Sequence, residues 1–186
     1  MKHLIDLILC LILLILLTIP MILVAITIRF TSKGPVLYWS DRVGKNGEMF
    51  RMPKFRSMRE EAPQVPTHLL NDSNDFLYPF GSFIRRYSID EFPQLYSILK
   101  RDMSFVGPRP ALFNQGDLIS LRKANGVIRL LPGLTGLAQI NGRDNLSINE
   151  KVAWDLEYLK KQSILLDLKI LFKTLISVLK RDGVSH

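Results

Sequence analysis

The chain of 186 residues has only one cysteine, Cys10, and only three histidines. A single cysteine excludes an intramolecular disulfide bond, which suits a protein that folds in a reducing compartment. Because Cys10 lies in an apolar run, we interpret it as a small hydrophobic residue. His68 has no metal-ligand partner at a useful spacing, and zinc-finger spacing is absent.

Long runs of lysine and arginine are also missing, although the net charge is +8. Such a charge predicts an anionic partner, which is nucleic acid, anionic lipid or a phosphorylated substrate. Without basic runs, nucleic acid is the weakest of the three, and we expect no nucleic-acid partner. The glycines of 131–143 lack the Gly-Lys-Ser/Thr of a Walker A loop and the spacing of a dinucleotide fingerprint. Those glycines, Gly133 among them, still allow close backbone approach to a ligand.

An uncharged apolar run, residues 7–28, stands near the N-terminus. It is long enough to cross a bilayer as a helix, and too long for a cleaved signal peptide. Pro20 removes one backbone hydrogen bond from such a helix and bends it. Lys2 precedes the run, and Arg29 and Lys33 follow it, so charge gives a single span no clear orientation. Two topologies therefore fit: a transmembrane anchor, and a helix that bends at Pro20 and leaves on the face it entered.

Two adjacent carboxylates, Asp90 and Glu91, lie at the predicted start of a helix. Ser88 and Glu91 have the spacing of a capping box, and either Ser88 or Asp90 is the expected cap. The free N–H groups and the dipole of a helix start favour anions, including phosphate. Apolar residues then recur with a helical period, at Phe92, Leu95, Tyr96 and Leu99.

Arginines stand on both sides of this acidic pair. Arg85 and Arg86 precede it, and Arg109 follows it between Pro108 and Pro110. The two prolines hold the backbone around Arg109, and a rigidly presented guanidinium can grip a phosphate with two hydrogen bonds. Carboxylates among arginines predict a phosphate site with a metal ion. The alternative is a helix cap with ordinary ion-pair partners.

The remaining chain predicts a small α/β domain that is mostly helical. A turn at 44–47 between apolar runs at 36–39 and 49–52 predicts a β-hairpin. Lys54, Arg56 and Arg59 form a basic cluster that faces either phosphate, lipid headgroups or solvent. We expect a surface loop over 60–75 and helices over 114–131 and 149–162. The apolar stripe of the last helix predicts either an interfacial helix or one packed on the core, and consists of Ile164, Leu168, Leu171, Leu175 and Leu179.

Five motifs, in order and with family-like spacing, resemble the bacterial sugar transferase family, the monotopic polyprenyl-phosphate phosphoglycosyl transferases. They are Lys54-Phe55-Arg56-Ser57-Met58, Ser88-Ile89-Asp90-Glu91-Phe92-Pro93-Gln94-Leu95, Gly107-Pro108-Arg109-Pro110, Pro132-Gly133-Leu134-Thr135-Gly136 and Asn141-Gly142-Arg143. The resemblance covers nearly the whole chain and matches the small members of the family. It implies a re-entrant membrane helix over 1–30, broken at Pro20, and a cytosolic, membrane-associated catalytic domain over 31–186. The family's Ser-Pro pair at the break is Ile19-Pro20 here.

The resemblance also implies a reaction. A sugar 1-phosphate would move from a UDP-sugar to undecaprenyl phosphate, with release of UMP, at the cytoplasmic face of the bacterial inner membrane. Asp90 would be the nucleophile and a ligand of Mg²⁺, and Glu91 would assist the metal site or proton transfer. Phosphate or nucleotide contacts would come from Arg109, Arg85, Arg86, Lys54, Arg56, Arg143 and Gly133. A Mg²⁺-dependent phosphohydrolase and a non-catalytic basic membrane adaptor are the alternatives.

Overall fold

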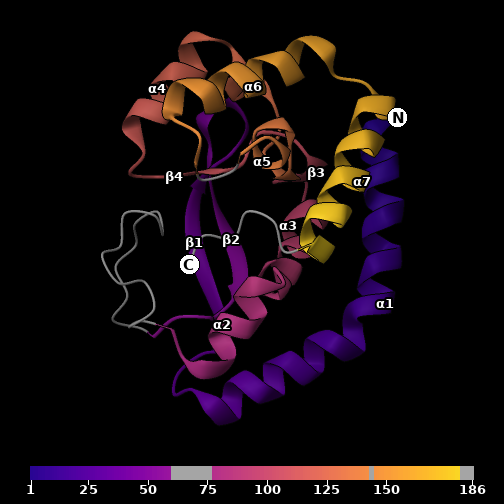
Figure 1. The fold of residues 1–186 in the computed structure, drawn as a ribbon, viewed down its shortest axis with the longest axis vertical. Coiled ribbons are helices and arrows are strands. Elements are labelled where there is room, and N and C mark those ends of the chain that lie inside the picture. Colours follow the sequence, from indigo (N-terminus) through magenta and orange to yellow (C-terminus); the bar gives the residue numbers. More distant parts are fainter. Residues whose placement is uncertain (60–76, 143–144, 181–186) are drawn as a thin grey trace.

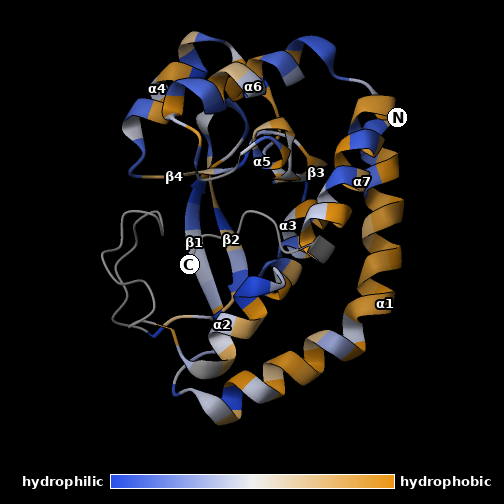
Figure 2. Cartoon of the chain, viewed as in Figure 1, coloured by the Kyte–Doolittle hydropathy of each residue, from blue (hydrophilic) through white to orange (hydrophobic). Residues whose placement is uncertain are grey.

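A helix of 30 residues, α1 (Lys2–Thr31), carries the apolar run and bends in its middle (Figure 1). The computed structural model describes residues 1–59, 77–142 and 145–180. Pro20 lies inside α1, and its missing N–H and its ring account for the bend. Hydrophobic residues dominate α1 along its length (Figure 2). The helix is long and apolar enough to cross a bilayer.

The predicted hairpin is confirmed. Strands β1 (Leu37–Val43) and β2 (Met49–Phe55) pair antiparallel, and the short β4 (Ala111–Leu112) adds to the other side of β1. The turn closes through Gly44 N–H, which donates to Glu48 O at 2.7 Å. A 3₁₀ turn, η1 (Lys45–Gly47), lies inside it. Because β2 is an edge strand, it tolerates a proline in its second half.

The acidic pair lies on a 3₁₀ helix, and the expected capping box is wrong. Helix α2 (Pro79–Arg86) is followed by η4 (Ile89–Gln94) and then α3 (Leu95–Leu99). Ser88 has a left-handed backbone, with φ 54° and ψ 22°, and its side chain makes no cap hydrogen bond. A capping residue needs an extended backbone to aim its side chain at the next turn. Here Glu91 N–H donates to the backbone carbonyl of Ser88 at 3.1 Å, and the Ser88 hydroxyl does not cap the helix. Asp90 lies inside η4 and is not its cap either.

The C-terminal half is helical around a second, parallel pair of strands, β3 (Ser104–Val106) and β5 (Gly133–Thr135). The helix expected over 114–131 ends early, because Gly126 takes a φ of 71°. The helix expected over 149–162 is confirmed and begins with a true capping box of Ser147 and Glu150. The helices of this half are α4 (Gly116–Ala124), η5 (Val127–Arg129), α5 (Leu137–Ile140), α6 (Ile148–Lys161) and α7 (Ile164–Lys180).

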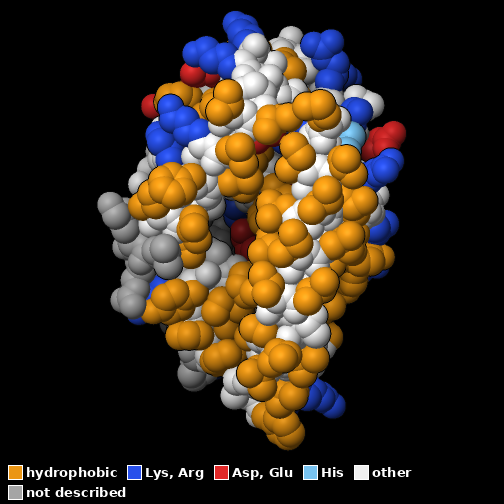
Figure 3. Space-filling model, turned by 90° about the vertical axis from the view of Figure 1, so that its right-hand side faces the viewer, with side chains coloured by type: hydrophobic (Ala, Val, Ile, Leu, Met, Phe, Trp, Pro, Cys, Tyr) orange, Lys and Arg blue, Asp and Glu red, His pale blue; other side chains and the backbone are white. Residues whose placement is uncertain are grey.

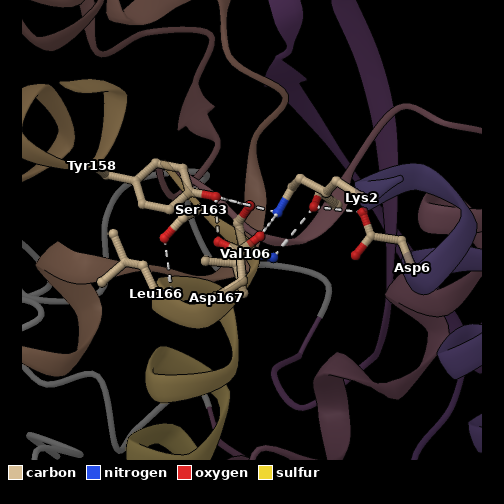
Figure 4. A network of polar contacts seen from close by, with 8 residues as sticks. Lys2, Asp6, Val106, Tyr158, Ser163, Leu166 and Asp167 are labelled. Atoms are coloured by element: carbon tan, nitrogen blue, oxygen red, sulfur yellow. Dashed lines mark hydrogen bonds and ion pairs between the residues drawn. The ribbon is translucent and has the colours of Figure 1, made fainter. Parts of the chain in front are cut away.

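Polar contacts attach the N-terminal end of α1 to the domain (Figure 4). Lys2 Nζ lies 2.5 Å from Asp167 Oδ2 on α7 and donates to the hydroxyl of Tyr158 at 3.2 Å. That hydroxyl donates to Asp167 Oδ1 at 2.7 Å. One turn along α1, Asp6 accepts a hydrogen bond of 2.8 Å from Ser104 Oγ. The start of the apolar helix is therefore held by β3, α6 and α7.

The C-terminal end of α1 is attached to the same domain. Ile28 is fully buried in a cluster with Phe55 and Ile84, and the carbonyl of Ser32 accepts a hydrogen bond of 3.1 Å from Arg56 Nη2. Between its two ends α1 exposes large hydrophobic side chains, and α7 exposes more beside it. Figure 3 shows that hydrophobic side chains cover most of this face. They include Ile15, Leu16, Ile19, Ile22 and Leu23 on α1, and Leu165, Leu168, Phe172 and Leu175 on α7.

Candidate active site

Strand β2 and helix η4 bring a lysine to the acidic pair. Lys54 Nζ lies 2.8 Å from Glu91 Oε1 and 4.0 Å from Asp90 Oδ2. All three residues lie largely out of solvent, and Asp90 is only 6% exposed. The sequence separates Lys54 from the pair by a long segment, but the hairpin folds it back onto η4. The structure thus joins two of the predicted motifs at one point.

Arg109 contacts the same carboxylate as Lys54, although Lys54 precedes the acidic pair in the sequence and Arg109 follows it. Its Nη2 lies 3.4 Å from Glu91 Oε1, and its side chain is 45% exposed. The prolines on either side of it are buried, which fits the prediction that the backbone here is rigid. Lys54 and Arg109 therefore converge on one oxygen of Glu91, while the Arg109 side chain stays partly exposed.

A second arginine, Arg42 on β1, belongs to this cluster and was not predicted. The strand register places Arg42 on the same sheet face as Lys54, since Tyr38 pairs with Lys54 and alternate residues share a face. Burial and, less strongly, the nearby charge of Arg109 lower the pKa of Arg42 to about 10, although the negative charge of Glu91 opposes them. Strand alternation is the sequence signal that could have identified Arg42. In the predicted hairpin, Arg42 shares a face with Lys54, which was already predicted to contact phosphate.

Opposing influences act on the pKa of the Asp90 carboxyl group. Burial raises its pKa to about 6, and the negative charge of Glu91 acts in the same direction. Lys54, Arg85 and Arg109 act in the other direction and favour the ionised form. At neutral pH Asp90 is therefore mostly ionised, and mild acid protonates it. A carboxylate with little solvation and several cations nearby suits nucleophilic attack on a phosphate.

The other arginines that were predicted to contact phosphate or nucleotide differ in their burial and in their partners. Arg85 is half-buried on α2, where it lowers the pKa of Asp90 and its Nη1 lies 3.2 Å from Met58 Sδ. Arg86, the next residue, is exposed. Arg56 is buried and binds the end of α1, as described above. Arg143 lies outside the residues that the structure describes.

Gly133 lies against another part of the chain. A Cβ added there would come within 2.1 Å of Gly107 N, so only glycine fits. Gly133 N–H donates to Pro108 O at 2.8 Å, and Gly107 N–H donates to Thr135 O at 2.8 Å. The sequence predicts close backbone approach to a ligand, whereas the contact that the structure shows at Gly133 is between β5 and the loop that carries Arg109. A contact of Gly133 with substrate stays a prediction.

The carboxylates of Asp90 and Glu91 provide the donor chemistry that Mg²⁺ uses. This ion typically takes one or two carboxylates, keeps several waters and completes its shell with substrate phosphate. No cluster of three or more histidine, cysteine or acidic side chains that could hold a metal ion occurs within the described ranges. The adjacent pair on η4 fits a shared magnesium–phosphate site.

Comparisons with known proteins agree with the motifs. A family model described as bacterial sugar transferase matches residues 1–181. The exopolysaccharide production protein ExoY of Sinorhizobium fredii is 35% identical, with 98% of this chain and 87% of that protein aligned. The undecaprenyl-phosphate galactose phosphotransferase of Salmonella typhimurium is 39% identical over 81% of this chain and 34% of that protein. An uncharacterized sugar transferase of Bacillus subtilis, EpsL, is 36% identical over 100% of this chain and 91% of its own length. This chain thus spans about a third of the length of the Salmonella typhimurium relative and most of the length of the other two.

Proposed function

Because this chain belongs to the bacterial sugar transferase family, we propose that it transfers a sugar 1-phosphate from a UDP-sugar to undecaprenyl phosphate and releases UMP. The arrangement that supports this most directly is the buried Asp90 beside Glu91, with Lys54 and Arg109 converging on that pair. The Salmonella typhimurium relative, which is named as an undecaprenyl-phosphate galactose phosphotransferase, makes the lipid phosphate the expected acceptor. Surface glycan assembly is the expected setting.

The proposed reaction has two displacements at phosphorus. A carboxylate oxygen of Asp90 attacks the β-phosphorus of the UDP-sugar, an O–P bond forms, and the bond between that phosphorus and the bridging oxygen breaks. UMP leaves with that oxygen, and the sugar phosphate stays on Asp90. A phosphate oxygen of undecaprenyl phosphate then attacks the same phosphorus and frees the Asp90 carboxylate. The covalent intermediate divides one difficult displacement into two.

Charge is the main obstacle, since an anionic nucleophile approaches an anionic diphosphate. Lys54, Arg109 and Arg42 supply three cations around the acidic pair. The partly exposed side chain of Arg109 suits it to hold the diphosphate, and Lys54 keeps Glu91 in place. Fixed cations of this kind stabilise the charge that builds up during transfer.

Mg²⁺ is the proposed cofactor. Asp90 and Glu91 would hold it together with the diphosphate of the substrate. Bound there, the ion would neutralise charge on the phosphoryl oxygens. Arg85 lies close enough to Asp90 to contribute charge. Arg86 and Arg143 are proposed to contact nucleotide or phosphate, as the resemblance implies.

We also propose that α1 is re-entrant, with both ends on the cytoplasmic face of the bacterial inner membrane. The support is that Lys2 at one end and Ser32 just after the other end are bonded to one domain. A straight span would separate those ends by the thickness of a bilayer. The exposed hydrophobic residues of α1 and α7 would then lie in lipid, with α7 as an interfacial helix. Figure 3 shows a hollow in this face with acidic side chains at its bottom, which would give a lipid phosphate a route inward.

The experiment that tests the chemistry omits the lipid acceptor. Purified enzyme with Mg²⁺ and a matching UDP-sugar, found by screening UDP-sugars for UMP release, should release about one UMP per active site. Mass spectrometry should place the sugar phosphate on the peptide that carries Asp90. Asp90→Asn, the matched control, should give no burst and no adduct.

UMP that appears only after undecaprenyl phosphate is added, with no adduct, would indicate direct transfer instead. Repeated turnover without acceptor would indicate the phosphohydrolase.

A further inference from the structure

The loop that carries Arg109 is held at each of its carbonyl groups. Pro108 O accepts from Gly133 N–H at 2.8 Å. Arg109 O accepts from Arg122 Nη1 at 2.7 Å. Pro110 O accepts from Arg42 Nη1 at 3.0 Å. Three successive carbonyls are therefore fixed by three different elements, β5, α4 and β1, while the Arg109 side chain stays partly exposed.

The middle of these three bonds depends on a buried ion pair. Arg122 on α4 donates from Nε and Nη2 to Asp155 Oδ2 on α6, at 2.9 and 2.7 Å. The two side chains are 7% and 2% exposed. A guanidinium that is anchored along one edge has its remaining Nη fixed in direction, because the group is planar. Asp155 therefore aims Arg122 Nη1 at the carbonyl of Arg109.

We infer that Arg122 is a positioning residue, held by Asp155, that sets the place of the Arg109 guanidinium at the acidic pair. The contact is with the backbone of Arg109 itself, so a change at Arg122 moves the base of the side chain that reaches Glu91. Neither Arg122 nor Asp155 touches Asp90, Glu91 or Lys54 through any bond or ion pair within the described part of the chain. This inference rests on the proposed function, in which Arg109 holds the diphosphate.

The test is a double-mutant cycle that combines Arg122→Lys with Arg109→Lys. Lysine at position 122 keeps a positive charge beside Asp155, but it loses the planar guanidinium that bonds Asp155 and the carbonyl of Arg109 at the same time. In the wild-type background, Arg122→Lys should lower kcat/KM for the UDP-sugar by about tenfold to a hundredfold, the range expected of a misplaced binding group. In the Arg109→Lys background the same change should lower kcat/KM by less than about threefold, since the group that it positions is already gone.

A matched control separates positioning from general destabilisation. Tyr158→Phe, on the same helix as Asp155, removes a buried hydroxyl whose single proton has two acceptors within reach, Asp167 Oδ1 at 2.7 Å and Val106 O at 3.2 Å. Any loss of activity that it causes should be the same in both backgrounds. Melting temperatures of all variants should be measured in parallel. If Arg122→Lys fails to fold, Asp155→Asn, which retains an acceptor for Arg122, takes its place in the cycle.

The outcomes are distinct. Equal losses from Arg122→Lys in both backgrounds, or no loss in the wild-type background, would overturn the positioning role and leave the proposed function standing. Full activity of Arg109→Lys alone would instead remove Arg109 from the proposed mechanism, and the positioning role with it. A loss confined to the background that retains Arg109 supports the inference.

Discussion

Asp90 and Glu91 are neighbours in the chain but have different surroundings. Glu91 Oε1 has Lys54 Nζ at 2.8 Å and Arg109 Nη2 at 3.4 Å. Asp90 is more buried, and its closest ion-pair contact, Lys54, lies at 4.0 Å. Two carboxylates whose environments differ in this way are suited to different roles. This difference fits the proposed roles, in which Glu91 holds the cations and the less firmly paired Asp90 forms the bond to phosphorus.

Arg109→Lys should not be a mild change. Lysine keeps the charge but loses the planar fork that can hold two phosphate oxygens. We expect a loss of about 2–3 kcal/mol of transition-state stabilisation, or roughly 30- to 150-fold in turnover. Steady-state UMP release with undecaprenyl phosphate present measures this. Near-wild-type turnover would reduce Arg109 to a turn residue.

Asp90→Asn should abolish most activity and stabilise the fold. The fold raises the pKa of Asp90 from 3.8 to about 6, so ionisation favours the unfolded chain as pH rises between these values. At pH 7.5 the variant should gain about 1–3 kcal/mol in free energy of unfolding, and less at pH 5. Turnover should fall by on the order of a thousandfold or more. Denaturant unfolding in detergent at both pH values tests the stability, and an unchanged or smaller stability at pH 7.5 would contradict this account of Asp90.

The UMP burst should also depend on pH. In the proposed mechanism only the ionised form of Asp90 attacks phosphorus, so the burst rate should decline as pH falls through about 6. Rapid-quench measurements between pH 5 and 8 would show it. Lys54→Gln should shift the midpoint to higher pH, because Lys54 favours the ionised form. A midpoint near the ordinary aspartate value would mean that another group limits the step.

At the scale of the elements, the bend of α1 depends on Pro20. Pro20→Leu restores the backbone hydrogen bond that proline removes and should straighten the helix. Single cysteines near Lys2 and Lys33, in a Cys10→Ala background, report the side on which each end lies. Both positions should be labelled from the cytoplasm in the parent, and Pro20→Leu should shift position 2 toward the periplasm. Periplasmic labelling of position 2 in the parent would show a true span.

Prediction from sequence succeeded for elements that depend on local pattern. The hairpin and the helix over 149–162 follow from turn residues and apolar period. The capping box failed because Ser88 takes a left-handed backbone after α2, which the spacing does not reveal. Arg42, Arg122 and Asp155 were missed because each meets its partner across a long stretch of chain. The parallel pairing of β3 with β5 was not predicted either. The two strands are far apart in the sequence, and they are too short to show an alternating pattern.

At the scale of the whole molecule, the first and last helices described meet at one polar network. Lys2, Tyr158 and Asp167 join α1, α6 and α7 (Figure 4). Asp167 is 9% exposed, so its charge depends on Lys2 for compensation. The network fixes where the apolar helix leaves the domain, beside the exposed hydrophobic side chains of α7.

Lys2→Met should therefore weaken the whole fold, not only its N-terminus. We expect a fall of about 1–3 kcal/mol in the free energy of unfolding, measured by denaturant in detergent. Lys161→Met is the matched control, because Lys161 pairs with Glu157 at 3.0 Å in the open, with its side chain 69% exposed. That change should cost less than about 1 kcal/mol. Equal effects of the two substitutions would show that the network contributes no more than a surface pair.

The bend of α1 has a consequence for the bilayer itself. A helix whose two ends stay at one surface occupies the volume of one leaflet only, and the opposite leaflet receives nothing to match it. Each molecule would then act as a wedge that spreads headgroups on its own side. Such wedges bind preferentially where lipids are loosely packed or where the surface curves toward them. Small, strongly curved vesicles should accordingly take up this protein more readily than large, flat ones of the same lipid.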